Sequence, residues 1–594
     1  MKKLFTLLLV FGLLFGLVAC VDDEPDQKDD EQDQKGSEEE DDANKDPEDE
    51  EPTLEEKIQE KINKILNELT IEEKIGQMFI VGFPGTTVPN SLKDAVKNNK
   101  FGNFIYFGEN VADDSKVPLM SDTLQDLVMD EVGIPALITM DHEGGMVVRF
   151  AENATHYPGN MGLVATGNPN NAYEVGKKSG QELRHFGVNT NLAPVLDVNN
   201  NPQNPVIGVR SFSDLPAVVS KYGLKLIEGY RESKVLTTAK HFPGHGDTTV
   251  DSHYGLPLIP HSKDRLYEIE LAPFIDAIEA GVDSIMSAHI IFSAFDDELP
   301  ATLSHKVLTE LLRDELGFDG IIMTDEMRMQ AIRSNFEVGE AAIMAIEAGA
   351  DMLLYAESTS TSLEAYAGVL KAVKDGDISE ERINESVRRI LEKKYKYELF
   401  DDYKSRLDLD EDQLAANKQF SKDIVRSSIT LANGSVNWFS KNKSTLLIST
   451  KSTRHPLLPG YTINTNQNSF AVVGKKYLED AGVSQVGSQV IGTSLSTNEI
   501  NTILNLAKNY DQVVVAVENV TASQANLVNK LAAEKTNILV VALRNPYDYL
   551  SYNNVHHYVC TYGYYSDAVF SVFDLMLGKY TAKGKLPVTV EGLN

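Results

Sequence analysis

Short apolar segments alternate with amphipathic ones between about residue 54 and residue 400, and no other feature constrains the fold as strongly. The apolar segments have strand length, and those between them carry apolar residues at helical spacing, for example in 119–131 and 217–233. Eight such units predict a closed (β/α)8 barrel of the TIM type over residues 54–400, with a doubly wound open sheet as the alternative. The expected strands are residues 78–83, 103–107, 136–140, 190–196, 235–239, 284–288, 320–324 and 352–355.

Ionisable residues stand directly after five of these strands. They are Asp141 after the third strand, Asp197 after the fourth, Lys240 and His241 after the fifth, His289 after the sixth and Asp325 after the seventh. Each of them alone also fits a structural role, as a capping aspartate or a satisfied core histidine. In a barrel, however, the carboxyl ends of all strands meet around one mouth, where barrel enzymes hold their catalytic groups. The shared position therefore favours the barrel and predicts an active site at that mouth.

The segment 240–257, KHFPGHGDTTVDSHYGLP, has a composition that suits a functional loop better than a core. Cleavage of a glycosidic bond needs a carboxylate beneath the anomeric carbon and a proton donor beside the leaving oxygen. Asp325 is the candidate carboxylate. Basic groups such as Lys240 and Arg149 would favour its charged form.

Two residues are candidate proton donors. Glu143 lies near a strand end, as the acid of most glycosidases does. His253 is the alternative, because an extended loop would project Asp251 and His253 to the same side and let the carboxylate orient the imidazole. Glu326 follows Asp325 directly, and we expect it to play a supporting role.

The same loop also permits a metal site. Its possible ligands are His241, His245, Asp247, Asp251 and His253. Their spacing fits no standard zinc pattern, and the interleaved glycines and prolines suit a mobile loop better than a rigid cage. We therefore expect no metal and no other cofactor.

The first 53 residues have the composition of an export signal and a tether. A basic start and an apolar stretch end in Leu17-Val18-Ala19-Cys20, which resembles a bacterial lipobox, so residues 1–20 are expected to be a signal peptide and Cys20 the lipidated residue. An ordinary secretory signal with a chance cysteine is the alternative. Residues 21–53 are an acidic segment with almost no apolar residue, which predicts disorder.

The net charge of −33 argues against nucleic-acid partners, because a polyanion would be repelled. Nearly half of it comes from residues 21–51, which hold eighteen acids and three lysines. The only cysteine besides Cys20 is Cys560, so no intramolecular disulfide is expected in the mature protein.

Beyond the barrel, residues 401–430 read as a linker with helical parts, and residues 431–594 as a second domain. Strand and helix segments alternate again, which predicts a three-layer α/β sandwich with a mainly parallel sheet. The expected strands are residues 445–448, 471–473, 489–492, 513–517, 538–543 and 558–561.

The motifs KHFPGHGDTTVDSH, DHEGGMVVR, LAPVLDVN and IIMTDEM closely resemble glycoside hydrolase family 3, in its β-N-acetylglucosaminidase branch. The resemblance implies a retaining mechanism in which Asp325 is the nucleophile and His253, paired with Asp251, is the acid/base. It thereby favours His253 over Glu143 as the proton donor. It also implies sugar contacts from Asp141, Arg149, Arg210, Lys240 and His241.

The sequence and this resemblance together predict an exo-β-N-acetylglucosaminidase. It would release terminal N-acetylglucosamine from muropeptides or related glycans, as a monomer anchored through Cys20 to the extracellular face of the bacterial cytoplasmic membrane. Three alternatives stay open: a β-glucosidase, an enzyme that uses phosphate in place of water, and a non-catalytic glycan-binding lipoprotein.

Overall fold

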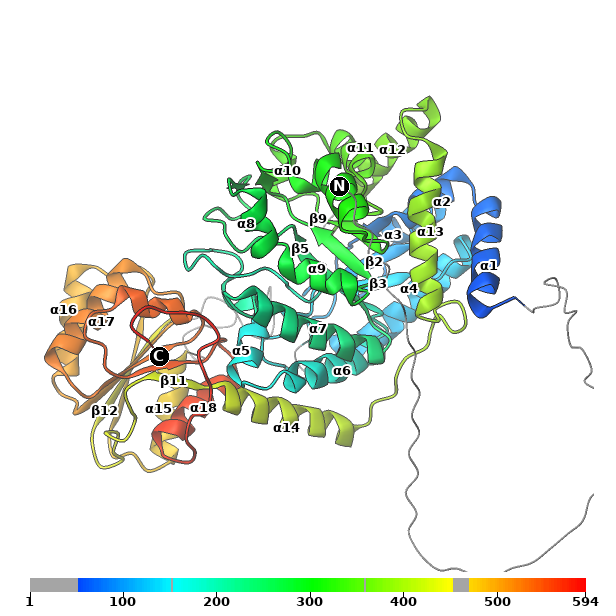
Figure 1. Cartoon of the computed structure of the whole chain (residues 1–594). Helices are drawn as coiled ribbons and strands as arrows, with labels where there is room; N and C mark the ends of the chain where they lie inside the picture. The colour runs from blue at the N-terminus through cyan, green and yellow to red at the C-terminus, as the bar shows by residue number, and fades with distance from the viewer. Residues whose placement is uncertain (1–51, 151–152, 357–358, 452–468, 594) are drawn as a thin grey trace, which may run out of the picture. The chain divides into compact units, whose positions relative to one another are not determined.

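Eight parallel strands close into a barrel in the order β1-β10-β9-β7-β5-β4-β3-β2 (Figure 1). The computed structural model describes residues 52–150, 153–356, 359–451 and 469–593, so Cys20 and most of the acidic segment lie outside the described residues. The closed barrel confirms the predicted fold over the open sheet. Its strands are β1 Phe79–Val81, β2 Asn103–Tyr106, β3 Leu137–Met140, β4 Thr190–Asn191, β5 Leu236–Phe242, β7 Ser284–Ser287, β9 Ile321–Glu326 and β10 Met352–Tyr355.

A helix follows every barrel strand and covers its outer face, which is why the strands read as continuous apolar runs and not as alternating ones. All seven residues of β5 are buried, for example. These helices are α3 Asn90–Asn99, α4 Val117–Glu131, α6 Asn170–His185, α7 Pro216–Glu232, α9 Ala272–Glu279, η4 Lys306–Glu315, α11 Val338–Ala348 and α12 Thr359–Asp375. Two helices precede the first strand, α1 Leu54–Glu68 and α2 Ile71–Gln77. Shorter ones lie in the loops, α5 Asn160–Ala165, α8 Lys263–Glu268 and α10 Gln330–Arg333.

The fourth strand is shorter than the expected 190–196. Regular pairing ends at Asn191, although the backbone stays beside β5 through the bonds Thr238 N to Ala193 O at 3.0 Å and Lys240 N to Pro194 O at 3.1 Å. Pro194 has no N–H to donate, so the ladder cannot continue evenly through it.

The amino-terminal end of the barrel is closed by α13 (Glu380–Lys396). Two aspartates with no exposed side-chain surface precede strands at this end, Asp283 before β7 and Asp351 before β10. Lys396 Nζ lies 2.6 Å from Asp283 Oδ1, and Arg389 NH1 lies 3.2 Å from Asp351 Oδ1. The last helix of the barrel thus supplies cations to carboxylates buried beneath the strands.

The second domain holds a six-stranded sheet in the order β11-β16-β15-β14-β12-β13. All neighbours are parallel except β11 and β16, which run antiparallel. The strands are β11 Thr430–Asn433, β12 Thr445–Thr450, β13 Val486–Ile491, β14 Gln512–Val517, β15 Ile538–Ala542 and β16 Tyr558–Cys560. The helix α14 (Glu411–Ser428) leads into this sheet.

Two apolar cores lie on the two faces of that sheet, which confirms the three-layer sandwich. The helices α16 Thr497–Ala507 and α17 Ala522–Glu534 bury side chains in one core, and α15 Phe470–Asp480 and α18 Ser566–Met576 in the other.

The prediction of a strand over residues 471–473 is wrong. These residues belong to α15, whose first turn is capped by Ser469 Oγ accepting from Val472 N. The buried face of this helix consists of Phe470, Ala471, Gly474 and Leu478. The edge strand β11 was not expected. Among the described residues, no helix combines the length and apolar character that crossing a membrane requires.

Candidate active site

A cavity of about 470 Å³ opens at the carboxyl ends of the barrel strands. A volume of this size accommodates a sugar residue. All eight predicted catalytic and sugar-binding residues line it, which are Asp141, Arg149, Arg210, Lys240, His241, Asp251, His253 and Asp325. The structure therefore brings together residues that are up to 184 positions apart in the sequence, and their chemical roles remain predictions.

Asp325 lies at the end of β9, and its Oδ1 accepts a hydrogen bond from Glu326 N at 2.8 Å. Burial alone would raise the pKa of this carboxyl. The imidazoles of His241 and His289, the hydrogen bond from Glu326 N and the ammonium group of Lys240 together outweigh that effect, and the pKa falls to about 2. Asp325 is therefore ionised at neutral pH, as a nucleophile must be.

Next to Asp325, two acids and three bases form a buried charge network. Lys240 Nζ lies 2.7 Å from Asp141 Oδ1 and 2.8 Å from Glu143 Oε1. Arg210 binds Glu143 with two hydrogen bonds, of 2.9 Å and 2.7 Å, and Arg149 NH2 lies 3.3 Å from Asp141 Oδ2. Burial opposes ionisation of Glu143, but Arg210 and Lys240 hold its pKa well below the usual range. A carboxylate held in this way cannot donate a proton, so the geometry speaks against Glu143 as the acid.

His241 is oriented by Asp197, a fully buried aspartate after β4. Asp197 Oδ2 lies 2.7 Å from His241 Nδ1, and Asp197 Oδ1 accepts from the backbone N–H groups of His241 and His245. Burial disfavours the charge on Asp197, yet the imidazole of His241 keeps the pKa of the Asp197 carboxyl below the ordinary value. These contacts fix the ring of His241 against the cavity wall.

The predicted pair of Asp251 and His253 forms. Asp251 Oδ1 lies 2.7 Å from His253 Nδ1 and also accepts from His253 N at 2.9 Å. The loop is a turn at this point and not the extended chain that we expected, since Tyr254 N and Gly255 N both donate to Asp251 O. An aspartate that caps its own turn brings its carboxylate to the residue two positions on, which is why the contact survives the different backbone.

Buried contacts hold the base of this loop. Asn204 Nδ2 donates to the carbonyls of His245 and Gly246, both at 2.8 Å. A side chain at Gly246 would place its Cβ 1.6 Å from Val198 O, so only glycine fits there. His245 reaches Ser252 Oγ through Nε2 at 2.9 Å, and burial lowers the pKa of His245 to about 4. The tip of the loop is more exposed to solvent than its base, and the side chain of His253 is 57% exposed.

One group of side chains in the described residues has ligand atoms close enough for a metal ion: Asp247, His261 and Glu270. Arg265 lies within this group, with NH2 at 3.3 Å from Asp247 and 3.1 Å from Glu270. A guanidinium thus stands between the two carboxylates and already compensates their charge. This arrangement anchors the loop and does not resemble a metal cage.

Glu326 also lines the cavity, behind Asp325. Its carboxylate accepts from Arg328 N at 2.9 Å and from Ala356 N at 3.2 Å, and so ties the end of β9 to the end of β10. Burial raises the pKa of Glu326 to about 7. Its supporting role stays a prediction.

Arg544 and Tyr254 are among the cavity residues that the sequence analysis did not single out. Arg544 comes from the second domain, after β15, and Tyr254 follows His253 with 76% of its surface exposed. Tyr254 belongs to a loop that the sequence already singled out. Arg544 lies in the second domain, for which the sequence predicted a structural or wall-contacting role and no catalytic residue.

The comparisons with known proteins agree with the resemblance noted in the sequence. Residues 70–393 match the family described as Glycosyl hydrolase family 3 N terminal domain. A beta-hexosaminidase A from Pseudoalteromonas piscicida is 37% identical over 52% of this chain, and the chain spans just over half, 56%, of that relative. A beta-hexosaminidase from Idiomarina loihiensis is 33% identical over 44% of this chain and 80% of its own length.

Solved structures extend the similarity to both domains. The glycoside hydrolase family 3 beta-N-acetylglucosaminidase from Paenibacillus sp. str. FPU-7 matches with a TM-score of 0.80 and 36% identity, over 88% of this chain and 99% of that one. A structure described as beta-glucoside phosphorylase BglX matches with a TM-score of 0.75 and 24% identity, over 90% of this chain and 96% of that one, and supports the fold alone. Since the family match covers more than half of the sequence, this chain belongs to glycoside hydrolase family 3.

Proposed function

We propose that this protein is a retaining exo-β-N-acetylglucosaminidase that releases terminal N-acetylglucosamine from muropeptides or related glycans. The observation that carries the proposal is one cavity that holds both an ionised Asp325 and an imidazole, His253, oriented by Asp251. A carboxylate and a positioned proton donor are what glycosidic cleavage with retention requires. The hexosaminidase relatives support the choice of sugar.

In the first step, a carboxylate oxygen of Asp325 attacks the anomeric carbon, and the bond from that carbon to the leaving oxygen breaks. The leaving oxygen takes a proton from Nε2 of His253. Asp251 accepts the Nδ1–H bond and therefore leaves Nε2 as the nitrogen that gives and receives the proton. In the second step, water gives a proton to Nε2, its oxygen attacks the anomeric carbon, and Asp325 is released.

The charge network beside Asp325 would bind the sugar. Lys240 and Arg149 hold the Asp141 carboxylate in a fixed orientation, where it accepts hydrogen bonds from sugar hydroxyls. Arg210 is locked by Glu143 and presents its remaining N–H groups. Groups that are paired in advance lose little freedom when the sugar binds.

The test compares initial rates of the soluble form, residues 52–594, on an aryl N-acetyl-β-glucosaminide and on the matching aryl β-glucoside. A strong preference for the first supports the proposal, and a preference for the second makes the protein a β-glucosidase. A 5-fluoro glycosyl donor should then leave a covalent adduct on the peptide that contains Asp325, seen by mass spectrometry. Absence of turnover and adduct together would favour a glycan-binding protein.

Phosphate is a second candidate acceptor. A histidine does not repel an anionic acceptor as a carboxylate would, and the cavity is lined by Arg149, Arg210, Lys240 and Arg544. Product analysis in phosphate buffer distinguishes the two reactions. Free N-acetylglucosamine identifies water as the acceptor, and the sugar 1-phosphate identifies phosphorolysis.

We further propose that Cys20 anchors the protein through lipid to the extracellular face of the cytoplasmic membrane. The support is the lipobox-like sequence before it and the acidic segment after it. Metabolic labelling with a clickable fatty acid should mark the full-length protein, and Cys20→Ala should abolish the label. Retention of the label in that variant would refute the anchor.

A further inference from the structure

The serine between Asp251 and His253 is buried, although the loop around it is exposed. Ser252 is 2% exposed, whereas Tyr254, two residues on, is 76% exposed, and the side chain of His253 is exposed as well. A buried hydroxyl normally has a hydrogen-bond partner, so the burial of Ser252 points to a contact on which the loop depends. The proposed reaction gives this serine no task.

The partner of Ser252 is His245, near the start of the same loop. His245 Nε2 lies 2.9 Å from Ser252 Oγ, and His245 Nδ1 lies 3.2 Å from Thr248 Oγ1. His245 is 2% exposed, and burial lowers its pKa to about 4, so the imidazole is neutral at pH 7. A neutral imidazole donates through one ring nitrogen and accepts through the other. Because each nitrogen has a hydroxyl as its partner, the orientation of the ring is fixed within the loop.

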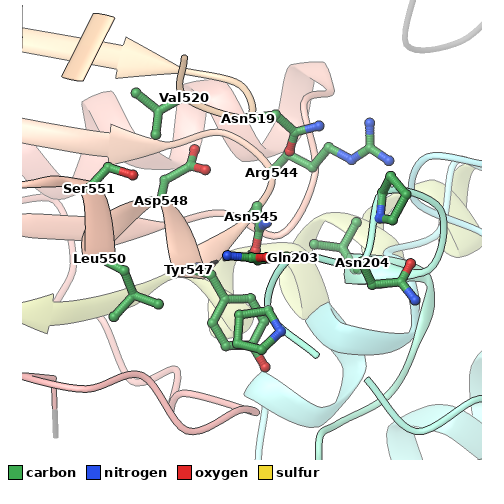
Figure 2. A pocket seen from close by; sticks show the side chains of 14 residues that line it. Gln203, Asn204, Asn519, Val520, Arg544, Asn545, Tyr547, Asp548, Leu550 and Ser551 are labelled. Atoms are coloured by element: carbon green, nitrogen blue, oxygen red, sulfur yellow. Dashed lines mark hydrogen bonds between the residues drawn. The ribbon is translucent and has the colours of Figure 1, made fainter. Parts of the chain in front are cut away.

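The backbone of His245 is fixed as well. Its N–H donates to Asp197 Oδ1 at 2.6 Å, and its carbonyl accepts from Asn204 Nδ2 at 2.8 Å. Asn204 Oδ1 accepts in turn from Val206 N and Ile207 N. Figure 2 shows Asn204 among the residues that line a cavity of about 510 Å³ between this barrel segment and the second domain. His245 is therefore a rigid base from which the rest of the loop extends.

Asp197 links this base to the buried half of the catalytic site. Its other oxygen, Oδ2, lies 2.7 Å from Nδ1 of His241, a predicted sugar contact. The rings of His241 and His245 have centroids 5.8 Å apart and stand edge to face. One buried carboxylate therefore sets the positions of both histidines, of which one belongs to the predicted sugar site and the other contacts Ser252.

Ser252 has a second contact, to the element that follows the strand of the proposed nucleophile. Its carbonyl accepts from Ala331 N, in α10, at 3.4 Å. The helix α10 follows β9, at whose end Asp325 lies. Ser252 is thus connected both to the base of its own loop and to the segment beyond Asp325.

The acid/base pair moves with the turn that contains it. Tyr254 N and Gly255 N both donate to Asp251 O, and Asp251 Oδ1 accepts from His253 N. These bonds fix the geometry within the turn, but they do not fix where the turn lies in the cavity. The contacts of Ser252 supply that constraint.

We propose that His245 and Ser252 are positioning residues for the proton donor. Their hydrogen bond holds the turn of Asp251 and His253 in the cavity that also holds Asp325, and without this bond the turn is displaced for much of the time. His245 and Ser252 thus act through His253 and not on the sugar. This inference rests on the proposed function, because it concerns the placement of the proton donor assigned there.

The experiment uses the full-length protein in mild detergent and measures kcat/KM on two substrates. One is the disaccharide of two N-acetylglucosamine units, whose leaving oxygen needs a proton, and the other is a dinitrophenyl N-acetyl-β-glucosaminide, whose leaving group departs without one. The measured quantity is the ratio of kcat/KM for the disaccharide to that for the aryl glycoside. A displaced proton donor lowers this ratio, whereas a loss of folded protein lowers both values equally and leaves the ratio unchanged.

Two variants break the bond from its two sides. Ser252→Ala removes the hydroxyl and should lower the ratio about tenfold, the effect of losing one neutral hydrogen bond. His245→Phe removes both ring nitrogens at similar ring size and should lower the ratio by at least as much. Thr249→Ala is the matched control, because it removes a hydroxyl from an exposed position of the same loop and should keep the wild-type ratio.

A double variant tests whether Ser252 acts through His253. Once the proton donor is gone its position no longer matters, so Ser252→Ala combined with His253→Ala should give the same ratio as His253→Ala alone. A further fall of the ratio in the double variant would show that Ser252 acts by another route and would overturn the proposal.

The outcomes separate this inference from the proposed function. If the wild type cleaves both substrates and Ser252→Ala keeps the wild-type ratio, the positioning role is wrong and the glycosidase stands. If His245→Phe fails to fold, the ratio in Ser252→Ala still decides. A wild-type protein that cleaves neither substrate would reject the proposed function, and this inference with it.

Discussion

The two halves of the catalytic site are held in opposite ways. Asp325 lies on a barrel strand beside charged groups that are buried and paired several times over, as Lys240 is to Asp141 and Glu143. His253 lies on a loop tip, and its side chain is more than half exposed. Within the described part of the chain, its ring is hydrogen-bonded to Asp251. In the proposed mechanism the difference separates two tasks: the buried half would fix charge and geometry, and the exposed half would exchange protons with an incoming and a departing molecule.

Such a division has a physical reason. Charges that act on a developing transition state are most effective when they are buried and fixed in advance. A group that must protonate one molecule and then deprotonate another has to meet solvent and ligands of different size. The predictions below test this comparison, starting with the largest effect.

Removing the nucleophile should have the largest effect. Asp325→Ala should lower kcat by about 10⁴-fold or more on every substrate, aryl glycosides included, because the covalent intermediate of the proposed mechanism forms on this carboxylate. Initial rates on the aryl N-acetyl-β-glucosaminide measure this. Azide should restore part of the activity and give the α-glycosyl azide, a product that a merely unfolded variant cannot form.

Breaking the buried charge network should be the next largest effect. Glu143→Gln leaves Arg210 and Lys240 with one carboxylate fewer in a buried setting, a change that typically costs about 3–5 kcal/mol of stability. Chemical denaturation with a spectroscopic readout measures it. Glu398→Gln is the control, since its pair with Lys234 is exposed and should matter by less than about 1 kcal/mol. Equal losses of unfolding free energy in both variants would show that the buried network contributes no more to stability than an exposed ion pair.

Removing the proton donor should have an effect that depends on the leaving group. His253→Ala should lower kcat/KM about 10²- to 10³-fold for a disaccharide, whose leaving oxygen needs protonation, and far less for an activated aryl glycoside. The thermal midpoint should stay within a few degrees of wild type, because the side chain is exposed. If both substrate types lost activity equally, His253 would not be the acid.

The smallest effect concerns Glu326, the acid of the buried half with a raised pKa, about 7. Because the folded state keeps this proton over a pH range in which the unfolded state has lost it, the folded state binds more protons, and stability falls as pH rises from about 4 to about 7. Glu326→Gln removes this dependence. The unfolding free energy of the variant relative to wild type should therefore rise over that window, by roughly 1–3 kcal/mol. Denaturant titrations of both proteins at pH 5 and pH 8 measure this. If the difference in unfolding free energy between variant and wild type were the same at both pH values, the prediction would be wrong.

The barrel was predictable for two reasons. Its strands are buried on both faces and therefore form continuous apolar runs in the sequence, and its ionisable residues follow directly after the carboxyl ends of the strands. The Asp251–His253 pair was predictable because its partners are two residues apart. The pairing of Glu143 with Arg210 was not, since the two lie 67 positions apart and only the closed barrel brings them together. Edge strand β11 and the helix over 471–473 show a further limit, because short apolar runs in the second domain take their structure from tertiary packing.

The cations of α13 beneath the barrel have a consequence for how the protein is made. The chain leaves the ribosome from its amino terminus, so the strands before which Asp283 and Asp351 stand are synthesised well ahead of Lys396 and Arg389. Until that helix arrives, closing the barrel would bury Asp283 without the ammonium groups of Lys393 and Lys396, at a cost of several kcal/mol, and would leave Asp351 with the guanidinium of Arg313 in η4 alone. Nascent chains that end before residue 380 should therefore stay open to protease, and chains that extend past residue 400 should become resistant. Such an outcome would make the last helix of the barrel the element that sets when, during synthesis, the eight strands close.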